Sequence, residues 1–349
     1  MAKIILTGGG TGGHIYPNLA LIPSLKKEGF DVVYVGGGDG SLEKRLADNL
    51  GIEYYSIPAV KFVRGLSPKA VANNLKIPFI LMKAFAQGKK LIKSLKPDVI
   101  FAKGGYVSLP LILAHGKTPL VCHESDLTLG LANKIGKVMG GKILTSNPKT
   151  QGEFVGVPIR DDILGVDKDM ARRKLNLSKA DTVLLVVGGS SGARALNKAV
   201  WDKINLLTKK YVVLHIVGKN ATEIPQKTDR YIPIPYGDNM GELYAVSDVV
   251  LSRAGATAVA ELSALEKKAL FVPLPKGTSR GDQLDNAILA KKYGGRVLYE
   301  SEIKRLVHEI DKTLSLPPMR KMSADTNGKI VKIICDSIVA GDLCKNKKH

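Results

Sequence analysis

The sequence predicts an α/β protein with two domains, each built on a parallel, doubly wound sheet. Two observations carry this prediction. Short apolar runs alternate with segments of helical spacing, an order typical of parallel sheets whose strands are joined by helices. A strand, a glycine-rich loop and a helix also follow one another twice, near residue 4 and again near residue 182. The repeat predicts two similar domains that face each other across a cleft, with a boundary near residue 160.

Length and composition agree with two domains. The chain has 349 residues, enough for two cores of ordinary size, and its 44% hydrophobic and 24% charged residues are typical of a globular protein. No apolar run approaches the ~18 residues that span a bilayer. Met1 to Lys3 leads directly into the first strand, without room for a signal peptide. Cys122, Cys335 and Cys344 are odd in number, so we expect free thiols in a reducing cytoplasm.

The first domain, residues 1–160, opens with a strand at Lys3 to Leu6. The loop Gly8 to Gly13 and a helix over 18–27 complete its first βα unit. Further strands are predicted at 32–35, 54–57, 99–102, 120–122 and 142–145, and a long helix at 76–96. Because loops at the carboxyl ends of parallel strands line the ligand crevice, we expect a site at the loops that follow these strands.

The second domain, residues 161–327, repeats this order. A linking helix at 171–177 precedes a strongly apolar strand at 182–187, the loop Gly188 to Arg194 and a helix from Ala195. Further strands are predicted at 212–217, 231–234, 248–251 and 269–272. The last helix, within about 328–349, is amphipathic, and we expect it to pack back on the first domain.

The first glycine loop matches the dinucleotide fingerprint Gly-x-Gly-x-x-Gly at Gly8, Gly10 and Gly13. That fold also needs an acid at the end of the second strand to hold a ribose. Here the strand runs into three glycines, and Asp39 lies beyond them. A P-loop is excluded as well, because no Gly-Lys-Ser/Thr follows either glycine loop.

His14 directly follows the first glycine loop, which also carries the hydroxyl of Thr11. A lone histidine at a helix start is often structural. At the edge of a ligand crevice, however, an imidazole that titrates near neutral pH can act as a general base. We therefore favour a catalytic role for His14.

Two acidic segments are candidate ligand sites. Asp167-Lys168-Asp169 resembles the Asp-x-Asp of metal-dependent sugar transferases, but it opens a helix, where acids cap the N-terminus. We favour capping and expect no bound metal, since no other cluster has metal-ligand spacing. Glu261 lies one helical turn past Thr257, where a carboxylate can accept hydrogen bonds from the vicinal hydroxyls of a ribose.

The formal net charge of +20 indicates an anionic partner. Between Lys61 and Lys103 there are ten lysines and arginines and one acid, Asp98. Such a run is often a solvated face. Here its lysines alternate with apolar residues such as Phe79 and Phe85, a pattern that also describes a helix lying on an anionic membrane. Nucleic acid is disfavoured, because aromatic residues are only 5% of the chain and no reader motif is present.

A set of motifs in order from residue 4 to about 290 resembles one family, the MurG-type N-acetylglucosaminyltransferases of bacterial peptidoglycan synthesis. The motifs are GGGTGGHIYP, GGYVS, HESDLTLGLANK, VGVPIR, VVGGSSGAR, SRAGATAVAE and SRGDQLDN. The resemblance implies a GT-B fold and transfer of GlcNAc from UDP-GlcNAc to the C4 hydroxyl of MurNAc-pentapeptide on undecaprenyl pyrophosphate (lipid I to lipid II). It further implies inversion at the anomeric carbon, no cofactor or bound metal, a role in cell shape and division, and a peripheral location on the inner face of the cell membrane.

The resemblance also assigns residues. His14 is implied as the base, although a role in orienting the pyrophosphate stays open. The residues implied to bind UDP-GlcNAc are Thr11, Gly12, Gly13, Arg160, Ser190, Gly237, Met240, Ala256, Thr257, Glu261 and Gln283. Those implied on the acceptor side are Tyr106, Glu124, Asp126 and Asn133.

One departure and two alternatives accompany the resemblance. Many members carry Gln-Asn after His-Glu, whereas this chain has Ser125-Asp126. An acid is unexpected beside an anionic pyrophosphate, so Asp126, or Glu124, is a second candidate base. The alternatives are a related transferase with a different lipid or natural-product acceptor, and a non-catalytic nucleotide-sugar-binding protein.

Overall fold

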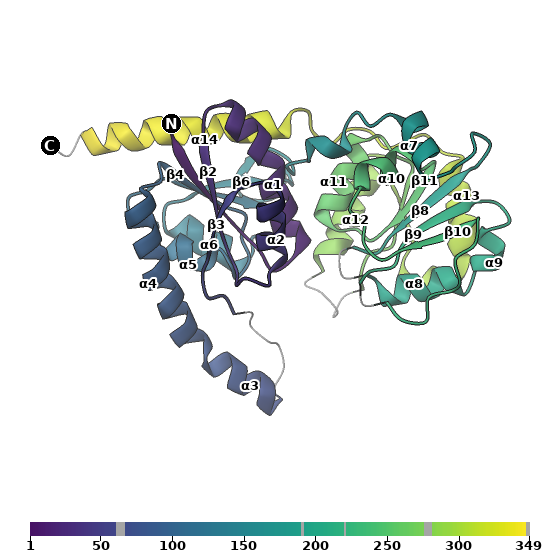
Figure 1. Ribbon diagram of the computed structural model, residues 1–349, viewed down its shortest axis with the longest axis horizontal. Helices are drawn as coiled ribbons and strands as arrows, with labels where there is room; N and C mark the ends of the chain where they lie inside the picture. The colour runs from purple at the N-terminus through teal and green to yellow at the C-terminus, as the bar shows by residue number, and fades with distance from the viewer. Residues whose placement is uncertain (61–66, 190–191, 220, 276–280, 347–349) are drawn as a thin grey trace. The chain divides into compact units, whose positions relative to one another are not determined.

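The computed structural model describes residues 1–60, 67–189, 192–219, 221–275 and 281–346. The chain divides into two compact units (Figure 1). Unit 1 comprises Met1–Pro158 and Asp325–His349, and unit 2 comprises Ile159–Ala324. Each unit is a parallel sheet with helices on both faces, which confirms the doubly wound architecture expected from the sequence.

The sheet of unit 1 is seven-stranded in the order β3-β2-β1-β4-β5-β6-β7, and every pairing is parallel. Its strands are β1 Lys3–Thr7, β2 Asp31–Gly36, β3 Glu53–Ser56, β4 Val99–Ala102, β5 Leu120–Glu124, β6 Lys142–Thr145 and β7 Glu153–Phe154. The central strands are mostly apolar, because helices bury both of their faces. The strand order changes direction between β1 and β4, and ligands of such folds bind at that point.

Two helix layers cover this sheet. The helices of unit 1 are α1 Gly12–Lys27, α2 Leu42–Asn49, α3 Pro68–Leu75, α4 Ile77–Leu95, α5 Leu109–Ala114, α6 Leu131–Val138 and α14 Thr326–Asn346. The C-terminal helix α14 lies beside α1 (Figure 1), where Ile330 and Ile334 are fully buried in the core with Leu21 and Leu25. α5 and α6 cover the other face. No helix of the described residues has both the length and the apolar character needed to cross a membrane.

The start of α1 differs from the prediction. The sequence placed the helix at 18–27, but it begins at Gly12 and contains Pro17. Glycine and proline are both poor helix formers, so this first turn has no sequence signal. As a result His14 belongs to the first turn of α1 and is not part of the loop before it.

Unit 2 repeats the topology with six parallel strands in the order β10-β9-β8-β11-β12-β13. The strands are β8 Val183–Val187, β9 Val212–Ile216, β10 Tyr231–Ile234, β11 Val249–Ser252, β12 Ala269–Phe271 and β13 Arg296–Val297. The helices are η1 Asp161–Ile163, α7 Lys168–Lys174, α8 Arg194–Trp201, α9 Ile204–Leu207, α10 Met240–Val246, α11 Ala256–Ala264, α12 Asp282–Lys292, η2 Glu300–Arg305 and α13 Leu306–Leu314. The direction changes between β8 and β11, which puts the second glycine loop at the corresponding position.

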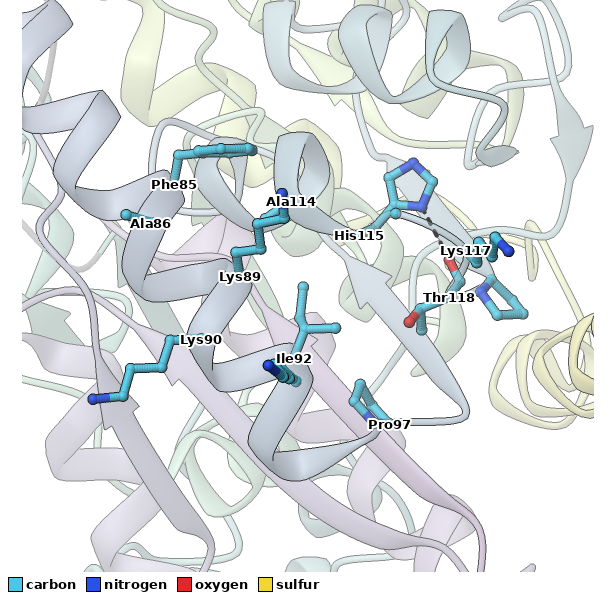
Figure 2. Close-up of a pocket in the computed structure, with 13 residues that line it drawn as sticks. Phe85, Ala86, Lys89, Lys90, Ile92, Pro97, Ala114, His115, Lys117 and Thr118 are labelled. Carbon is cyan, nitrogen blue, oxygen red and sulfur yellow. Dashed lines mark hydrogen bonds between the residues drawn. The ribbon is translucent and has the colours of Figure 1, made fainter.

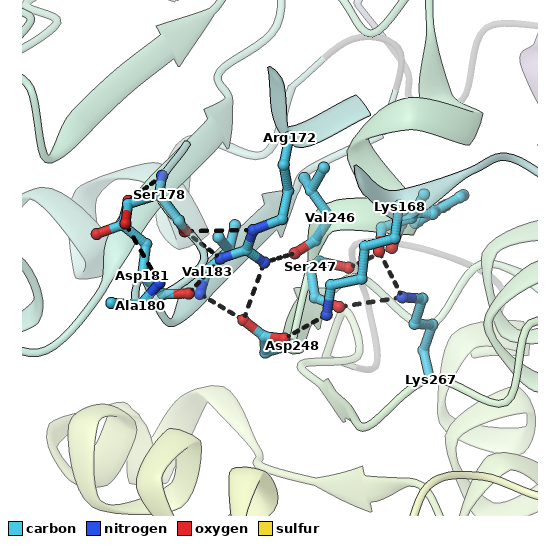
Figure 3. Close-up of polar contacts among 12 residues, drawn as sticks. Lys168, Arg172, Ser178, Ala180, Asp181, Val183, Val246, Ser247, Asp248 and Lys267 are labelled. Carbon is cyan, nitrogen blue, oxygen red and sulfur yellow. Dashed lines mark hydrogen bonds and ion pairs between the residues drawn. The ribbon is translucent and has the colours of Figure 1, made fainter. Parts of the chain in front are cut away.

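A polar network fixes α7 at the amino ends of the strands of this sheet, opposite the glycine loop (Figure 3). Asp248 accepts hydrogen bonds from the Val183 backbone N–H and from Lys168 Nζ, both at 2.9 Å, and Arg172 donates to the Ser178 carbonyl at 2.8 Å. Asp167 caps α7 by accepting the Met170 N–H at 2.7 Å, which confirms the capping interpretation of the Asp-x-Asp motif. The network holds the amino ends of β8 and β11, so the loops at their carboxyl ends extend from a fixed base.

Candidate active site

The first cluster lies at the carboxyl ends of β1 and β4 in unit 1. Thr11 Oγ1 and His14 Nδ1 are 3.0 Å apart, a hydrogen bond that fixes the plane of the imidazole. The ring lies against Gly105, where an added Cβ would come within 3.1 Å of Nδ1. Gly105 has a φ of +80°, so both its conformation and this close approach require glycine. The two glycine turns thus position His14 together.

Tyr106 closes the other side of the glycine loop. Its ring packs on Gly10, whose φ of +80° and missing side chain make room for the hydroxyl. Burial and the charge of Glu43 raise the pKa of Tyr106, so the phenol stays protonated and can donate a hydrogen bond. Tyr106 and His14 therefore lie on the same loop cluster, as expected from strands whose carboxyl ends meet at one edge.

Glu124, the last residue of β5, holds the loop that follows it. Its carboxylate accepts the Asp126 N–H at 3.1 Å, the Gly130 N–H at 2.8 Å and Asn133 Nδ2 at 2.9 Å. These hydrogen bonds give Glu124 and Asn133 a structural role, since they fix the conformation of the loop 125–130.

A buried lysine next to this loop was not singled out from the sequence. Lys103 is 2% exposed, and its Nζ donates to Ser125 Oγ at 2.7 Å. Burial lowers its pKa to about 8, against the opposing effect of Glu124 and Asp126. The signal that could have identified it is local, because a charged residue directly follows an apolar strand and precedes two glycines.

The second cluster lies in unit 2 around Glu261 of α11. Glu261 is 8% exposed, and its Oε2 accepts a hydrogen bond of 3.0 Å from the buried hydroxyl of Tyr244. Burial raises the pKa of Glu261 to about 7, whereas the charge of Arg160 and the Tyr244 bond act in the opposite direction. A carboxylate in this state can accept hydrogen bonds from hydroxyls once a ligand covers it. Tyr244 is a further residue that sequence reasoning missed.

The other residues assigned to the donor surround this pair or lie on neighbouring loops. Ala256 and Thr257 form the first turn of α11, and Gln283 in the first turn of α12 accepts the Leu274 N–H at 3.1 Å. Gly237 lies so close to Met240 at the start of α10 that a side chain at position 237 would collide with its sulfur. Ser190 lies outside the described residues.

The structure therefore separates the predicted residues into two sets. Unit 1 contains the predicted acceptor residues together with Thr11, Gly12, Gly13 and His14. The other described residues that were predicted to bind the donor belong to unit 2. Among the described residues no group of three or more His, Cys, Asp or Glu side chains could hold a metal ion.

Family models match both units. Residues 4–145 match the glycosyltransferase family 28 N-terminal domain, and residues 183–336 match the family 28 C-terminal domain. A protein of Lachnospira eligens is 40% identical over 95% of this chain and 94% of its own length. It is named UDP-N-acetylglucosamine--N-acetylmuramyl-(pentapeptide) pyrophosphoryl-undecaprenol N-acetylglucosamine transferase. A protein of Clostridium perfringens with the same name is 38% identical over 95% of this chain and 97% of its own.

Solved structures share the fold. The crystal structure of Acinetobacter baumannii MurG aligns with a TM-score of 0.68 and 23% identity, covering 96% of this chain and all of that one. The kitacinnamycin glycosyltransferase aligns with a TM-score of 0.64 at 13% identity, over 99% of this chain and 97% of its own. Together with the family 28 domains, these likenesses confirm the predicted GT-B fold.

Proposed function

The chain belongs to the family of UDP-N-acetylglucosamine--N-acetylmuramyl-(pentapeptide) pyrophosphoryl-undecaprenol N-acetylglucosamine transferases, and from this premise we propose which residues bind the donor, which bind the acceptor and which act as the base. It is a UDP-GlcNAc-dependent N-acetylglucosaminyltransferase that converts lipid I to lipid II in peptidoglycan synthesis. The observation that carries this conclusion is 40% identity over nearly the whole length of both chains. The residue roles that follow are our proposal.

Unit 2 binds the donor in this proposal. Glu261 accepts hydrogen bonds from the ribose hydroxyls, and the backbone from Gly237 to Met240 reads the uracil. The glycine loop after β8, with Ser190, receives the pyrophosphate at the start of α8, where backbone N–H groups favour an anion. The buried Tyr244–Glu261 hydrogen bond supports this assignment, since a carboxylate held away from water is suited to a neutral diol.

Unit 1 binds the acceptor and supplies the base. His14 takes the proton of the C4 hydroxyl of MurNAc as that oxygen attacks the anomeric carbon of GlcNAc. The bond from that carbon to the UDP oxygen breaks in the same displacement, so the configuration inverts and UDP leaves with the electron pair. The Thr11–His14 hydrogen bond supports the role of His14, because a general base has to be held in one orientation. The glycines of residues 8–13 leave room for the lipid pyrophosphate.

We also propose that α4 places unit 1 on an anionic membrane surface. Phe79 and Met82 are 76% and 68% exposed, an unusual state for large apolar side chains on a long helix. Further along the same helix, a cavity of about 710 Å³ lies between the second half of α4 and the segment 114–119 (Figure 2). Lysines and apolar side chains line it together, including Lys89, Lys93 and Phe85. The combination suits acyl chains and anionic headgroups.

The deciding experiment is transfer of labelled GlcNAc from UDP-GlcNAc to a lipid-I analogue, in the presence of EDTA. We expect a β1,4-linked product. Transfer only to other lipid acceptors would favour a related glycosyltransferase, and binding of UDP-GlcNAc without any transfer would favour a nucleotide-sugar-binding protein.

A further inference from the structure

The ammonium of Lys103 is buried where the reaction mechanism described above does not use it. Lys103 follows β4, and its backbone N–H donates to the Thr7 carbonyl at 2.8 Å, so it continues the central sheet beside the glycine loop. Its Cβ faces Gly8, where an added Cβ would lie within 3.0 Å. A lysine in such a place needs a reason, because burying an ammonium is unfavourable unless the charge is compensated.

The carboxylates that act on Lys103 are not in direct contact with it. In the described part of the chain it has no ion pair within 4.0 Å. The Glu124 carboxylate is bound to three N–H donors instead, and Asp126 acts on Lys103 without a direct ion pair. His123 is kept neutral, because burial first and the Lys103 charge second hold its pKa well below the ordinary value. The ammonium of Lys103 therefore lies next to the acceptor loops, bound to Ser125 and near two carboxylates but without a direct ion pair.

Ser125 connects this charge to the half-buried surface of the loop. A serine hydroxyl has one donor and two acceptor positions, and Ser125 Oγ uses an acceptor position for Lys103 Nζ at 2.7 Å. Its own hydrogen is thereby turned away from Lys103. A hydroxyl that accepts from a cation is a stronger donor, because successive hydrogen bonds polarise one another.

We propose that Lys103 is a positioning residue for the acceptor, which orients and polarises the Ser125 hydroxyl so that it donates to the diphosphate of the lipid-linked substrate. This inference rests on the proposed assignment of the unit 1 loops to the acceptor. It also accounts for Asp126 in place of an amide, since the buried cation offsets the negative charge of Asp126 beside an anionic substrate.

Two variants test the pair. Ser125→Ala removes the hydroxyl, and Lys103→Met removes the charge at similar length. We expect each to raise the acceptor KM about tenfold, the loss typical of one hydrogen bond to a charged group, with the UDP-GlcNAc KM unchanged. Lys267→Met is the matched control, because Lys267 is a half-buried lysine of unit 2 that donates to the Ser247 carbonyl at 3.0 Å. It should leave the acceptor KM unaltered.

The pH profile separates positioning from a merely structural role. Because the pKa of Lys103 is about 8, the wild-type kcat/KM for the acceptor should fall as the pH rises through about 8 and the ammonium loses its proton. The titratable groups that interact with Lys103 are Glu124, Asp126 and His123, and of these only the histidine can carry a positive charge, which its burial opposes. Lys103→Met should lack this alkaline limb, and Ser125→Ala should keep it in weaker form.

Binding measured without turnover completes the test. A short-chain prenyl diphosphate should bind to the wild type and about tenfold more weakly to either variant, by titration calorimetry. Unchanged binding and acceptor KM in folded Ser125→Ala would overturn the proposal, even if Lys103→Met failed to fold. Equal effects on donor and acceptor KM would also overturn it. A wild type that binds the diphosphate in a Lys103-dependent way but transfers no GlcNAc would contradict the proposed function and support this inference.

Discussion

The hydroxyl of Tyr244 donates a 3.0 Å hydrogen bond to Oε2 of Glu261, and both side chains are buried. The tyrosine comes from α10 and the glutamate from α11, so the pair joins two helices that flank β11. Because a buried carboxylate is unfavourable when ionised, the pair makes stability and donor binding depend on pH in opposite directions.

Glu261→Gln should stabilise the ligand-free protein at alkaline pH. Burial raises the pKa of Glu261 from 4.5 to about 7, so the folded state binds the proton more tightly than the unfolded state. The free energy of unfolding of the wild type should therefore decrease as the pH rises from 4.5 to 7, by at most about 1.4 kcal/mol per pH unit. The Glu261→Gln protein should not show this decrease, because glutamine does not ionise. Urea unfolding followed by Trp201, the chain's single tryptophan and a residue of unit 2, measures this at pH 5 and pH 8. A pH-independent difference between the two proteins would contradict it.

Glu261→Ala should raise the KM for UDP-GlcNAc about 30-fold or more, because the ribose hydroxyls lose a charged acceptor. The acceptor KM should change little. Glu242→Ala is the control, since Glu242 is another glutamate of unit 2 whose carboxylate is already paired with Lys174 at 2.6 Å. Initial rates with varied donor give the result. An unaltered donor KM in Glu261→Ala would remove this residue from the ribose site.

Tyr244→Phe should shift the acidic side of the pH profile of kcat/KM for UDP-GlcNAc to higher pH. The Tyr244 hydrogen bond lowers the pKa of Glu261, so its loss should move that pKa further above 7. Since the ionised carboxylate is the better acceptor for hydroxyls, kcat/KM for UDP-GlcNAc should begin to fall at a higher pH than in the wild type. The pH profile of kcat/KM checks this. A limb that stays in place would show that Tyr244 serves only to pack α10.

His14→Ala should lower kcat about 100-fold or more, the usual contribution of a general base. Thr11→Val should have a smaller effect, about tenfold, because it leaves the imidazole but removes the bond that orients it. Single-turnover transfer to a lipid-I analogue isolates the chemical step. Near-normal turnover of His14→Ala would exclude it as the base and direct attention to Asp126.

The buried strands were predictable because buried parallel strands are continuous apolar runs, as at Val183–Val187. The two-residue edge strands β7 and β13 were not predicted, since neither is an apolar run. Three short helices of unit 1 were not predicted, because α2, α5 and α6 have eight residues or fewer and so offer about two turns of pattern or less. The candidate site was likewise predictable only where its residues stand in a local sequence pattern. His14 and Glu261 stand in local motifs, which the sequence displays directly. The Tyr244–Glu261 and Lys103–Ser125 hydrogen bonds join separate elements, so only the folded chain reveals them, although the local position of Lys103 before two glycines is visible in the sequence.

Charge reversal on α4 should release the protein from anionic membranes. Each lysine near such a surface contributes about 1 kcal/mol, so replacing four by glutamate should weaken vesicle binding by orders of magnitude at physiological salt. The residues to change are the exposed Lys83, Lys89, Lys90 and Lys93. A matched control reverses four exposed lysines of unit 2, namely Lys179, Lys209, Lys227 and Lys312.

Sedimentation with vesicles that contain phosphatidylglycerol measures both variants. Replacing Phe79 and Met82 by serine should weaken vesicle binding to the same extent at low and high salt, because the insertion of apolar side chains is not electrostatic. The α4 reversal should instead lose its effect as salt rises. If the α4 and unit 2 reversals weakened binding equally, attraction would follow from the net charge of +20 and not from this surface.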